Sequence, residues 1–252
     1  MNVDRPLKLG ELLAETVRLY GERLWAAAGI GAFLGGAVLV AGILGELVLV
    51  IAVIAPAFTV CYAVAVRIAL GDPAGEAWAQ VGVRAPVLAP LMIIVSLPFV
   101  LGVVDALILF FSVAWLAFVG LAIPVAMIER APEGTSWFGQ IGFALTRATD
   151  LARPEFLHVL GVSAALTVIY ALFGPFLGLL LTGFADNGSL AAHVMANGVL
   201  GPFFFLGLSL LYFEQKARKE LSDTTGKLGN ETSDLDERTS EDVRNRDSGA
   251  DA

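Results

Sequence analysis

Long apolar segments constrain the fold of this chain more than any other feature. Three blocks with almost no charged residue cover 25–70, 86–128 and 156–213. A helix that crosses the ~30 Å hydrocarbon core of a bilayer needs ~20 mainly apolar residues, so each block has room for two crossings. The sequence therefore predicts an all-α fold. We expect a polytopic transmembrane helical bundle of about six spans, arranged as three hairpins that are each preceded by an amphipathic interfacial helix.

Each apolar block is interrupted near its middle by a carboxylate close to a glycine. The carboxylates are Glu46, Asp105 and Asp186, and we interpret them as hairpin tips because the glycines beside them break helices. The third span contains Pro90 and Pro98, so a kinked or partly re-entrant segment is an alternative there. The predicted membrane domain, 25–213, then consists of spans at 25–45, 47–70, 86–104, 106–128, 156–182 and 190–213.

The basic residues predict the orientation of these spans. All 16 lysines and arginines lie near the termini or around the two connections between hairpins, and the hairpin tips carry none. Short loops rich in Lys and Arg stay on the cytoplasmic side of a membrane, so we expect both termini to be cytoplasmic. The residues that we expect to anchor the helices at this lipid interface are Arg23, Trp25, Arg84, Arg153, Lys216, Arg218 and Lys219.

Segments that are too charged to span, yet have helical periodicity, precede the apolar blocks. In 1–24, apolar side chains repeat at helical spacing opposite a polar face, which predicts a cytoplasmic amphipathic helix on the membrane surface. A similar segment begins at Ser136, a good N-cap, and continues from Trp137. The segment at 75–84 is shorter. Three repeated units of common origin, or three hairpins with independently similar flanks, are equal alternatives.

The last part of the chain, 214–252, has a different composition. No aromatic residue follows Phe213, and Ser, Thr, Asp, Glu, Asn and Arg dominate. Such a segment cannot bury enough apolar surface to order itself, which predicts a disordered, acidic cytoplasmic tail. A tail with a regulatory or partner-binding role is the alternative.

Small residues predict where helices pack closely. Gly31 and Gly35 in the first span, and Gly174 and Gly178 in the fifth, have the four-residue spacing that lets helix backbones approach each other. We favour contacts within one molecule, because six spans must pack against one another. Contact with a second copy, as a homo-oligomer, or with another membrane protein is the alternative.

One pair of charged residues predicts a contact at the cytoplasmic face. Glu129 ends the fourth span and Arg147 lies on the surface helix that follows, so a fold-back of the chain would bring the two side chains together. We hypothesise that this pair docks the surface helix. The alternative is two independently solvated charges, since exposed ion pairs contribute only ~0–1 kcal/mol.

Residues suited to catalysis are scarce. The chain has one cysteine, Cys61, and two histidines, His158 and His193, far apart in the sequence. There is no HExxH, GxSxG, phosphate-loop or dinucleotide motif, so we predict no catalytic residue, no metal site and no cofactor. A net charge of −8 without a basic stripe argues against nucleic-acid binding.

Four short stretches carry a resemblance to a known family. They are 7–13 (LKLGELL), 124–129 (PVAMIE), 144–147 (ALTR) and 210–214 (LLYFE). Together they resemble the membrane domain associated with glycerophosphoryl diester phosphodiesterases, over most of 7–220. The resemblance implies a prokaryotic cytoplasmic-membrane protein with this hairpin arrangement. It does not imply hydrolysis, because in that family the phosphodiesterase chemistry belongs to a separate soluble barrel domain.

The sequence thus predicts an integral membrane protein that is not an enzyme, with a scaffold, regulatory or membrane-organising role. The alternative is a transporter or channel for a small or lipidic solute. A continuous polar cavity between the helices would favour transport, whereas a solid apolar bundle with a prominent cytoplasmic surface belt would favour a scaffold.

Overall fold

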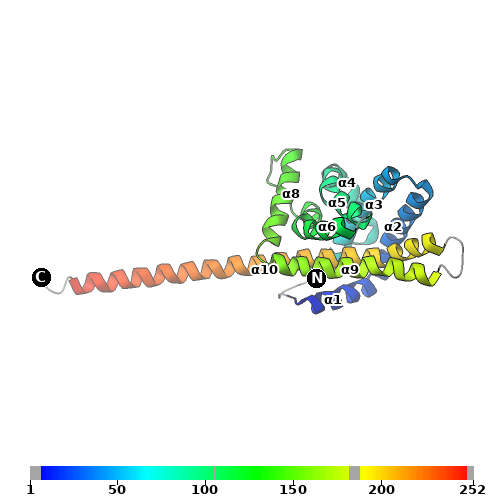
Figure 1. Ribbon diagram of the computed structural model, residues 1–252. Helices are drawn as coiled ribbons and strands as arrows, with labels where there is room; N and C mark the ends of the chain where they lie inside the picture. Colours follow the sequence, from blue (N-terminus) through cyan, green and yellow to red (C-terminus); the bar gives the residue numbers. More distant parts are fainter. Residues whose placement is uncertain (1–6, 105, 182–187, 249–252) are drawn as a thin grey trace.

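The computed structural model describes residues 7–104, 106–181 and 188–248. Side chains are described there except at 99, 102–104, 106–107, 174–175, 177–181, 188–189 and 226–248. Every regular element of these residues is a helix (Figure 1). Within this part of the chain, six helical segments are long and apolar enough to cross a membrane, which confirms the predicted all-α bundle. They are Leu24–Leu44, Leu47–Leu70, Ala74–Ser96, Ile108–Ile128, Phe156–Phe173 and Leu190–Thr225.

The first hairpin follows the predicted boundaries closely. The amphipathic helix α1 (Leu9–Glu22) is separate from α2 (Leu24–Leu44), and α3 (Leu47–Leu70) returns after a tight turn. Gly45 ends α2 with a φ of 68°, a left-handed conformation that residues with a Cβ rarely adopt. This turn lies at the predicted tip beside Glu46, which is the N-cap residue of α3.

The second hairpin differs from the prediction at its start. Residues 75–84 do not form a separate interfacial helix; they are the first half of α4 (Ala74–Leu91), which continues through Pro86. The helical path then runs through the π-helical turn η1 (Met92–Ser96) into α5 (Leu97–Val104). The predicted span 86–104 therefore lies within a longer helical path that begins at Ala74 and contains a π-helical turn. The chain returns through α6 (Ala106–Val119) and α7 (Ala122–Ile128).

Tryptophan side chains compensate for Pro90 of α4 and Pro98 of α5. A proline cannot donate to the carbonyl four residues earlier, so Pro90 frees the carbonyl of Pro86, and Pro98 frees that of Ile94. Trp137 Nε1 donates to the Pro86 oxygen at 2.9 Å, and Trp115 Nε1 donates to the Ile94 oxygen at 2.7 Å. Both carbonyls thus regain a partner, from α8 and α6 respectively.

The return helix of the second hairpin is broken between α6 and α7. Pro124 cannot donate to the carbonyl of Gly120, and the two residues at 120–121 form a turn. A Cβ placed at Gly120 would lie 2.3 Å from the Leu116 oxygen, so the break is compact enough to exclude a larger residue. The kink therefore has the usual cause of a proline with a neighbouring glycine.

The third hairpin consists of α8 (Trp137–Ala152), α9 (Phe156–Leu181) and α10 (Gly188–Ser248). Ser136 is the N-cap of α8, where its hydroxyl accepts a hydrogen bond from the Gly139 amide at 3.3 Å, in agreement with the sequence pattern. Figure 1 shows α9 and α10 side by side, with α1 along one side of them and α3 to α6 on the other. The first and last helices of the chain are therefore neighbours.

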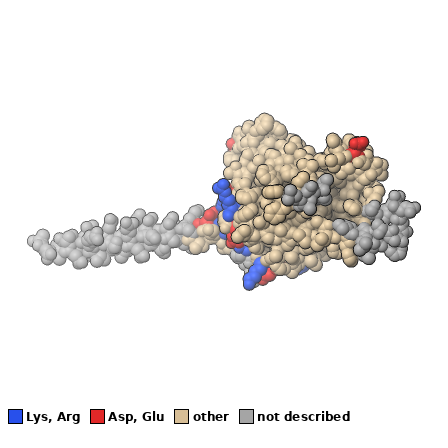
Figure 2. All heavy atoms as spheres, viewed as in Figure 1, with Lys and Arg blue, Asp and Glu red and all other residues tan. Residues whose placement is uncertain are grey.

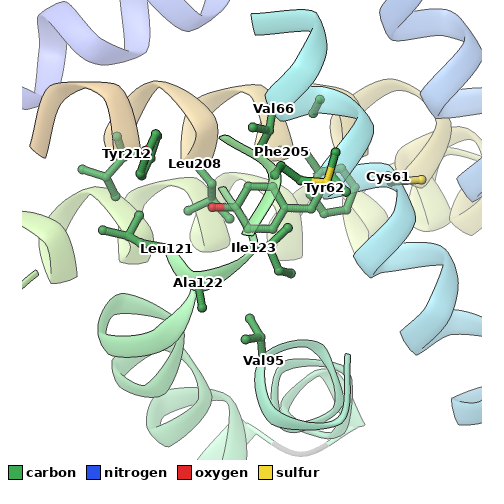
Figure 3. Packing of buried hydrophobic residues seen from close by; sticks show 14 of the residues in the cluster. Cys61, Tyr62, Val66, Val95, Leu121, Ala122, Ile123, Phe205, Leu208 and Tyr212 are labelled. Carbon is green, nitrogen blue, oxygen red and sulfur yellow. The ribbon is translucent and has the colours of Figure 1, made fainter. Parts of the chain in front are cut away.

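Aromatic and branched side chains fill the centre of the bundle (Figure 3). Tyr62 of α3 stacks on Phe205 of α10 with a ring-centroid distance of 5.9 Å and an interplanar angle of 20°. Phe58 contacts the same Phe205 ring edge-on at 4.6 Å. Leu121 and Ile123 from the α6–α7 break pack beside them, so the kink places apolar side chains in the core.

Close packing of α2 on α10 accounts for the predicted small-residue face. A Cβ added at Gly31 would lie 1.9 Å from the Gly198 carbonyl oxygen, and one at Gly35 would lie 3.2 Å from the Val194 oxygen. Pro202 cannot donate to the Gly198 carbonyl, and the Cα–H of Gly31 points at this freed oxygen instead. The contact of Gly31 and Gly35 is within the molecule. The other predicted packing residues, Gly174 and Gly178, lie outside the residues whose surroundings the structure describes.

The helix α10 is longer than the predicted sixth span. It continues past residue 214, where we expected a disordered tail, and ends at Ser248. Glu214 and Gln215 are buried, and Arg218 lies one turn from Glu214 at the i,i+4 spacing that stabilises helices. These contacts account for the first turns of α10 beyond residue 213. The predicted boundary at 214 therefore lies inside α10 rather than at its end.

Candidate functional site

Charged residues gather at the end of the bundle from which α10 projects. Figure 2 shows blue and red atoms there, against a body whose surface is otherwise mostly tan. Seven side chains at this end form hydrogen bonds and ion pairs with one another, and we call them the end network: Glu129, Arg147, Tyr212, Glu155, His158, Glu214 and Arg218.

The first half of the end network is centred on Glu129, which follows the last residue of α7. Its Oε2 lies 3.0 Å from Arg147 Nε of α8, and its Oε1 accepts a hydrogen bond of 2.8 Å from the Tyr212 hydroxyl of α10. The side chains of Glu129 and Arg147 are only 14% and 26% exposed, so solvent screens this pair less than a surface pair. The structure thus brings together the two residues singled out in the sequence and adds Tyr212.

The second half of the end network is centred on Glu214, whose side chain is fully buried. Its Oε2 lies 3.1 Å from His158 Nε2 of α9, and its Oε1 accepts from Arg218 Nε at 2.8 Å. The same Oε1 accepts from the backbone N–H of Leu7 at 3.2 Å. Burying a carboxylate is costly unless donors compensate it, and here both oxygens have donors.

Arg218 extends the second half to two further segments. It pairs with the carboxylate of Glu155, which lies just before α9, and it donates from Nη2 to the Leu7 carbonyl at 3.0 Å. The chain just before α1 is therefore held by both its N–H and its C=O. Glu214 and Arg218 join the start of α1 to the start of α9 and to α10.

The end network consists of hydrogen bonds and ion pairs that connect different helices to one another. Each central carboxylate accepts hydrogen bonds on both oxygens, so its charge is compensated by donors from neighbouring helices and from the segment before α1. In the part of the chain that the structure describes, no group of three or more His, Cys, Asp or Glu side chains is placed to hold a metal ion. The arrangement can fix the positions of α1, α7, α8, α9 and α10 relative to one another.

The predicted anchor residues have different surroundings. Trp25 is 88% exposed at the start of α2, and Arg23 and Arg153 are also exposed. Lys216 and Lys219 are half-buried on α10. Arg218 differs from the prediction, because its guanidinium is bound by Glu214 and Glu155 rather than directed only at lipid headgroups. Arg84 lines a hollow, which is described below.

The sequence analysis did not predict that Glu214, Glu155 and His158 belong to the end network. The only local signal was Arg218, four residues after Glu214 in a helix. The remaining contacts join residues 56, 63 and 207 or more positions apart, so no spacing rule could indicate them.

Comparisons with protein-family models, with curated proteins and with solved structures find no match to this chain.

Proposed function

We propose that this chain is a non-enzymatic, multi-pass protein of a prokaryotic cytoplasmic membrane, with both termini in the cytoplasm and a scaffold or membrane-organising role. The observation that carries the proposal is the end network. Its buried charges bind one another and hold helix ends together, an arrangement suited to presenting a fixed surface beside the membrane. The resemblance to the phosphodiesterase-associated membrane domain supports the same assignment.

The packing of the bundle supports a scaffold over a transporter. Large side chains from α3, α10 and the turn between α6 and α7 are fully or almost fully buried in one cluster; they include Tyr62, Phe204, Phe205 and Leu121. Ionisable side chains in the middle of a span usually mark transport pathways. The described ion pairs of this chain instead involve the end of α3 (Arg67 with Asp72), the end of α7 (Glu129) and, through Glu214 and Arg218 of α10, the segments just before α1 and α9. A solid apolar centre with a polar belt at one end is what the scaffold predicts.

The distribution of basic residues supports the proposed orientation. The end network contains Arg147 and Arg218, and all 16 lysines and arginines belong to the segments that we assign to the same side. The positive-inside rule places that side in the cytoplasm. In intact cells, a C-terminal tag should be inaccessible to an impermeant label and become accessible on lysis.

The test of the scaffold role compares helix docking with solute flux. In Glu129→Gln, Arg147 loses its charged partner, and we expect backbone amides of α8 to exchange hydrogen for deuterium faster than in the unaltered protein. Glu76→Gln, an exposed carboxylate in the first turn of α4, is the matched control and should leave this exchange unchanged. Purified protein in liposomes should release entrapped ions and small dyes no faster than empty liposomes.

Two results would contradict the proposal. Saturable solute flux that depends on the protein would favour a transporter instead. Unchanged exchange of α8 in both Glu129→Gln and Arg147→Glu would show that the pair does not dock the helix. The end network would then no longer support a scaffold role.

A further inference from the structure

A small hollow close to the end network is lined by two arginines that form no ion pair with any residue that the structure describes. It has a volume of about 260 Å³ and lies between Arg84 of α4, the loop at 130–135 and Gln140 of α8. Sites for drug-sized ligands occupy roughly 300–1,000 Å³, so this hollow fits a smaller chemical group.

The walls of the hollow are held in place by the protein itself. The Thr135 amide donates to the Pro132 carbonyl at 3.1 Å, and Gly134 has a φ of 80°, which together form a turn of type II. On the opposite side, the bond from Trp137 Nε1 to the Pro86 carbonyl fixes the start of α8 against α4. The loop and both helices therefore need no ligand to take this shape.

The charge of the hollow is positive. Among the residues that the structure describes, Arg84 and Arg130 form no ion pair, in contrast to Arg67, Arg147 and Arg218. Glu133 is the carboxylate on the wall, so two guanidinium groups face one acidic group. Guanidinium groups present paired donors that match the oxygens of a phosphate.

The surface next to the hollow is apolar and exposed. Val83, beside Arg84, is 75% exposed, and Phe138, near the start of α8, is 74% exposed. Trp137 is also exposed, at 42%. Aromatic residues beside arginine are typical of the interface between hydrocarbon and lipid headgroups. An occupant of the hollow would therefore have an anionic group in the hollow and an apolar part alongside it.

We propose that this hollow binds the phosphate group of an anionic glycerophospholipid, between Arg84 and Arg130. The acyl chains lie outside, along Val83 and Phe138. A soluble phosphate compound shares the headgroup chemistry but has nothing to place on the apolar surface. The proposal depends on this end of the bundle lying at a membrane surface, and neither on the orientation of the chain nor on its scaffold role.

Native mass spectrometry of the purified full chain in mild detergent tests the site. The protein is titrated with phosphatidylglycerol and, in parallel, with zwitterionic phosphatidylcholine. We expect phosphatidylglycerol to bind more tightly, and Arg84→Gln and Arg130→Gln each to weaken it about fivefold to tenfold, the usual size of a lost charged hydrogen bond. Glu133→Gln should strengthen binding about threefold, because it removes the opposing charge on the wall.

Arg153→Gln is the matched control, since Arg153 is an exposed arginine at the end of α8 that does not line the hollow. The Arg153→Gln variant measures the general attraction of an exposed cation for anionic lipid. We expect its affinity for phosphatidylglycerol to change by less than twofold. The thermal unfolding midpoint of every variant is measured in the same detergent, so that loss of binding can be separated from loss of fold.

The outcomes are distinct. Equal weakening by Arg84→Gln, Arg130→Gln and Arg153→Gln in folded protein would mean unspecific attraction and would overturn the site. A Glu133→Gln variant that binds more weakly would also overturn it. Competition by inorganic phosphate or glycerol phosphate at the concentration where the lipid binds would identify a soluble phosphate as the ligand and overturn the lipid assignment. None of these results depends on the topology or flux experiments.

Discussion

The contact of α2 with α10 makes a sharp prediction about four glycines of one helix. Gly31 lies so close to Gly198 that a Cβ would be 1.9 Å from its carbonyl oxygen, whereas Gly29 and Gly36 have no neighbouring atom within 4 Å. Gly35 is intermediate, with its nearest atom at 3.2 Å. An alanine scan of this helix therefore changes the same residue type in three different environments.

The expected magnitudes follow from these distances. Ordinary contact of a Cβ begins near 3.4 Å, so Gly31→Ala must move α2 away from α10 by about 1.5 Å. Overpacking costs ~1–3 kcal/mol, and the atom met here is a backbone oxygen that cannot rotate away. Alanine regains up to ~1 kcal/mol of helix propensity over glycine. We expect a net loss of about 2 kcal/mol in the free energy of unfolding for Gly31→Ala.

The other positions provide the controls. Gly36→Ala and Gly29→Ala meet no neighbour and should be neutral or stabilising by up to ~1 kcal/mol. In Gly35→Ala the small overlap and the gain in propensity should roughly cancel. The difference between Gly31→Ala and Gly36→Ala is thus about 3 kcal/mol, which is larger than the whole effect of most single substitutions.

Unfolding by sodium dodecyl sulfate in mixed micelles, followed by far-ultraviolet circular dichroism, measures this difference. Size-exclusion chromatography of the same samples records the oligomeric state. If Gly31→Ala proved as stable as Gly36→Ala, the described packing of α2 on α10 would be wrong. If Gly31→Ala changed only the oligomeric size, the glycine face would belong to a contact between two copies.

Two further predictions concern hydrogen bonds that hold the bundle together. Trp137→Phe removes the donor to the Pro86 carbonyl and should cost about 1 kcal/mol in the same unfolding assay. Adding Pro90→Ala should restore most of this, because Ala at 90 supplies a backbone N–H; an unchanged loss in the double variant would refute the assignment. Glu214→Ala leaves its buried basic partners uncompensated, so a loss of about 3–5 kcal/mol and faster proteolysis of the N-terminal segment are expected. Exposed Glu220→Ala should change neither, and equal effects of the two variants would contradict the argument.

Much of the fold was accessible from the sequence because bilayer thickness limits the length of each apolar element. The turn at Gly45 and the separation of α1 from α2 followed from local composition, and the Ser136 cap from a local motif. The neighbourhood of Glu129 and Arg147 was open to the same reasoning, because only one short loop and half a helix separate them.

Features that depend on distant residues could not be predicted in this way. Pro86 reads as a helix boundary, yet α4 continues through it and through Pro90, and the Pro86 carbonyl that Pro90 leaves free is met by the distant Trp137 of α8. The hydrogen bonds of Glu214 join the N-terminal segment to the last span. Hydropathy identifies each span by itself, so it gives no information on contacts between segments that are distant in the sequence. The continuation of α10 past residue 213 involves buried Glu214 and its pairing with Arg218, which composition does not indicate.

The prolines of this bundle have a consequence for how its helices choose their neighbours. Pro90, Pro98 and Pro202 each free a carbonyl that hydrocarbon cannot satisfy, and a donor from one particular helix meets it: Trp137 of α8, Trp115 of α6 and the Gly31 Cα–H of α2 respectively. An alternative arrangement of the same six spans would leave those acceptors unmatched. Residues usually regarded as defects in a helix thus favour particular helix neighbours, because an arrangement without these donors leaves the freed carbonyls unpaired inside the lipid.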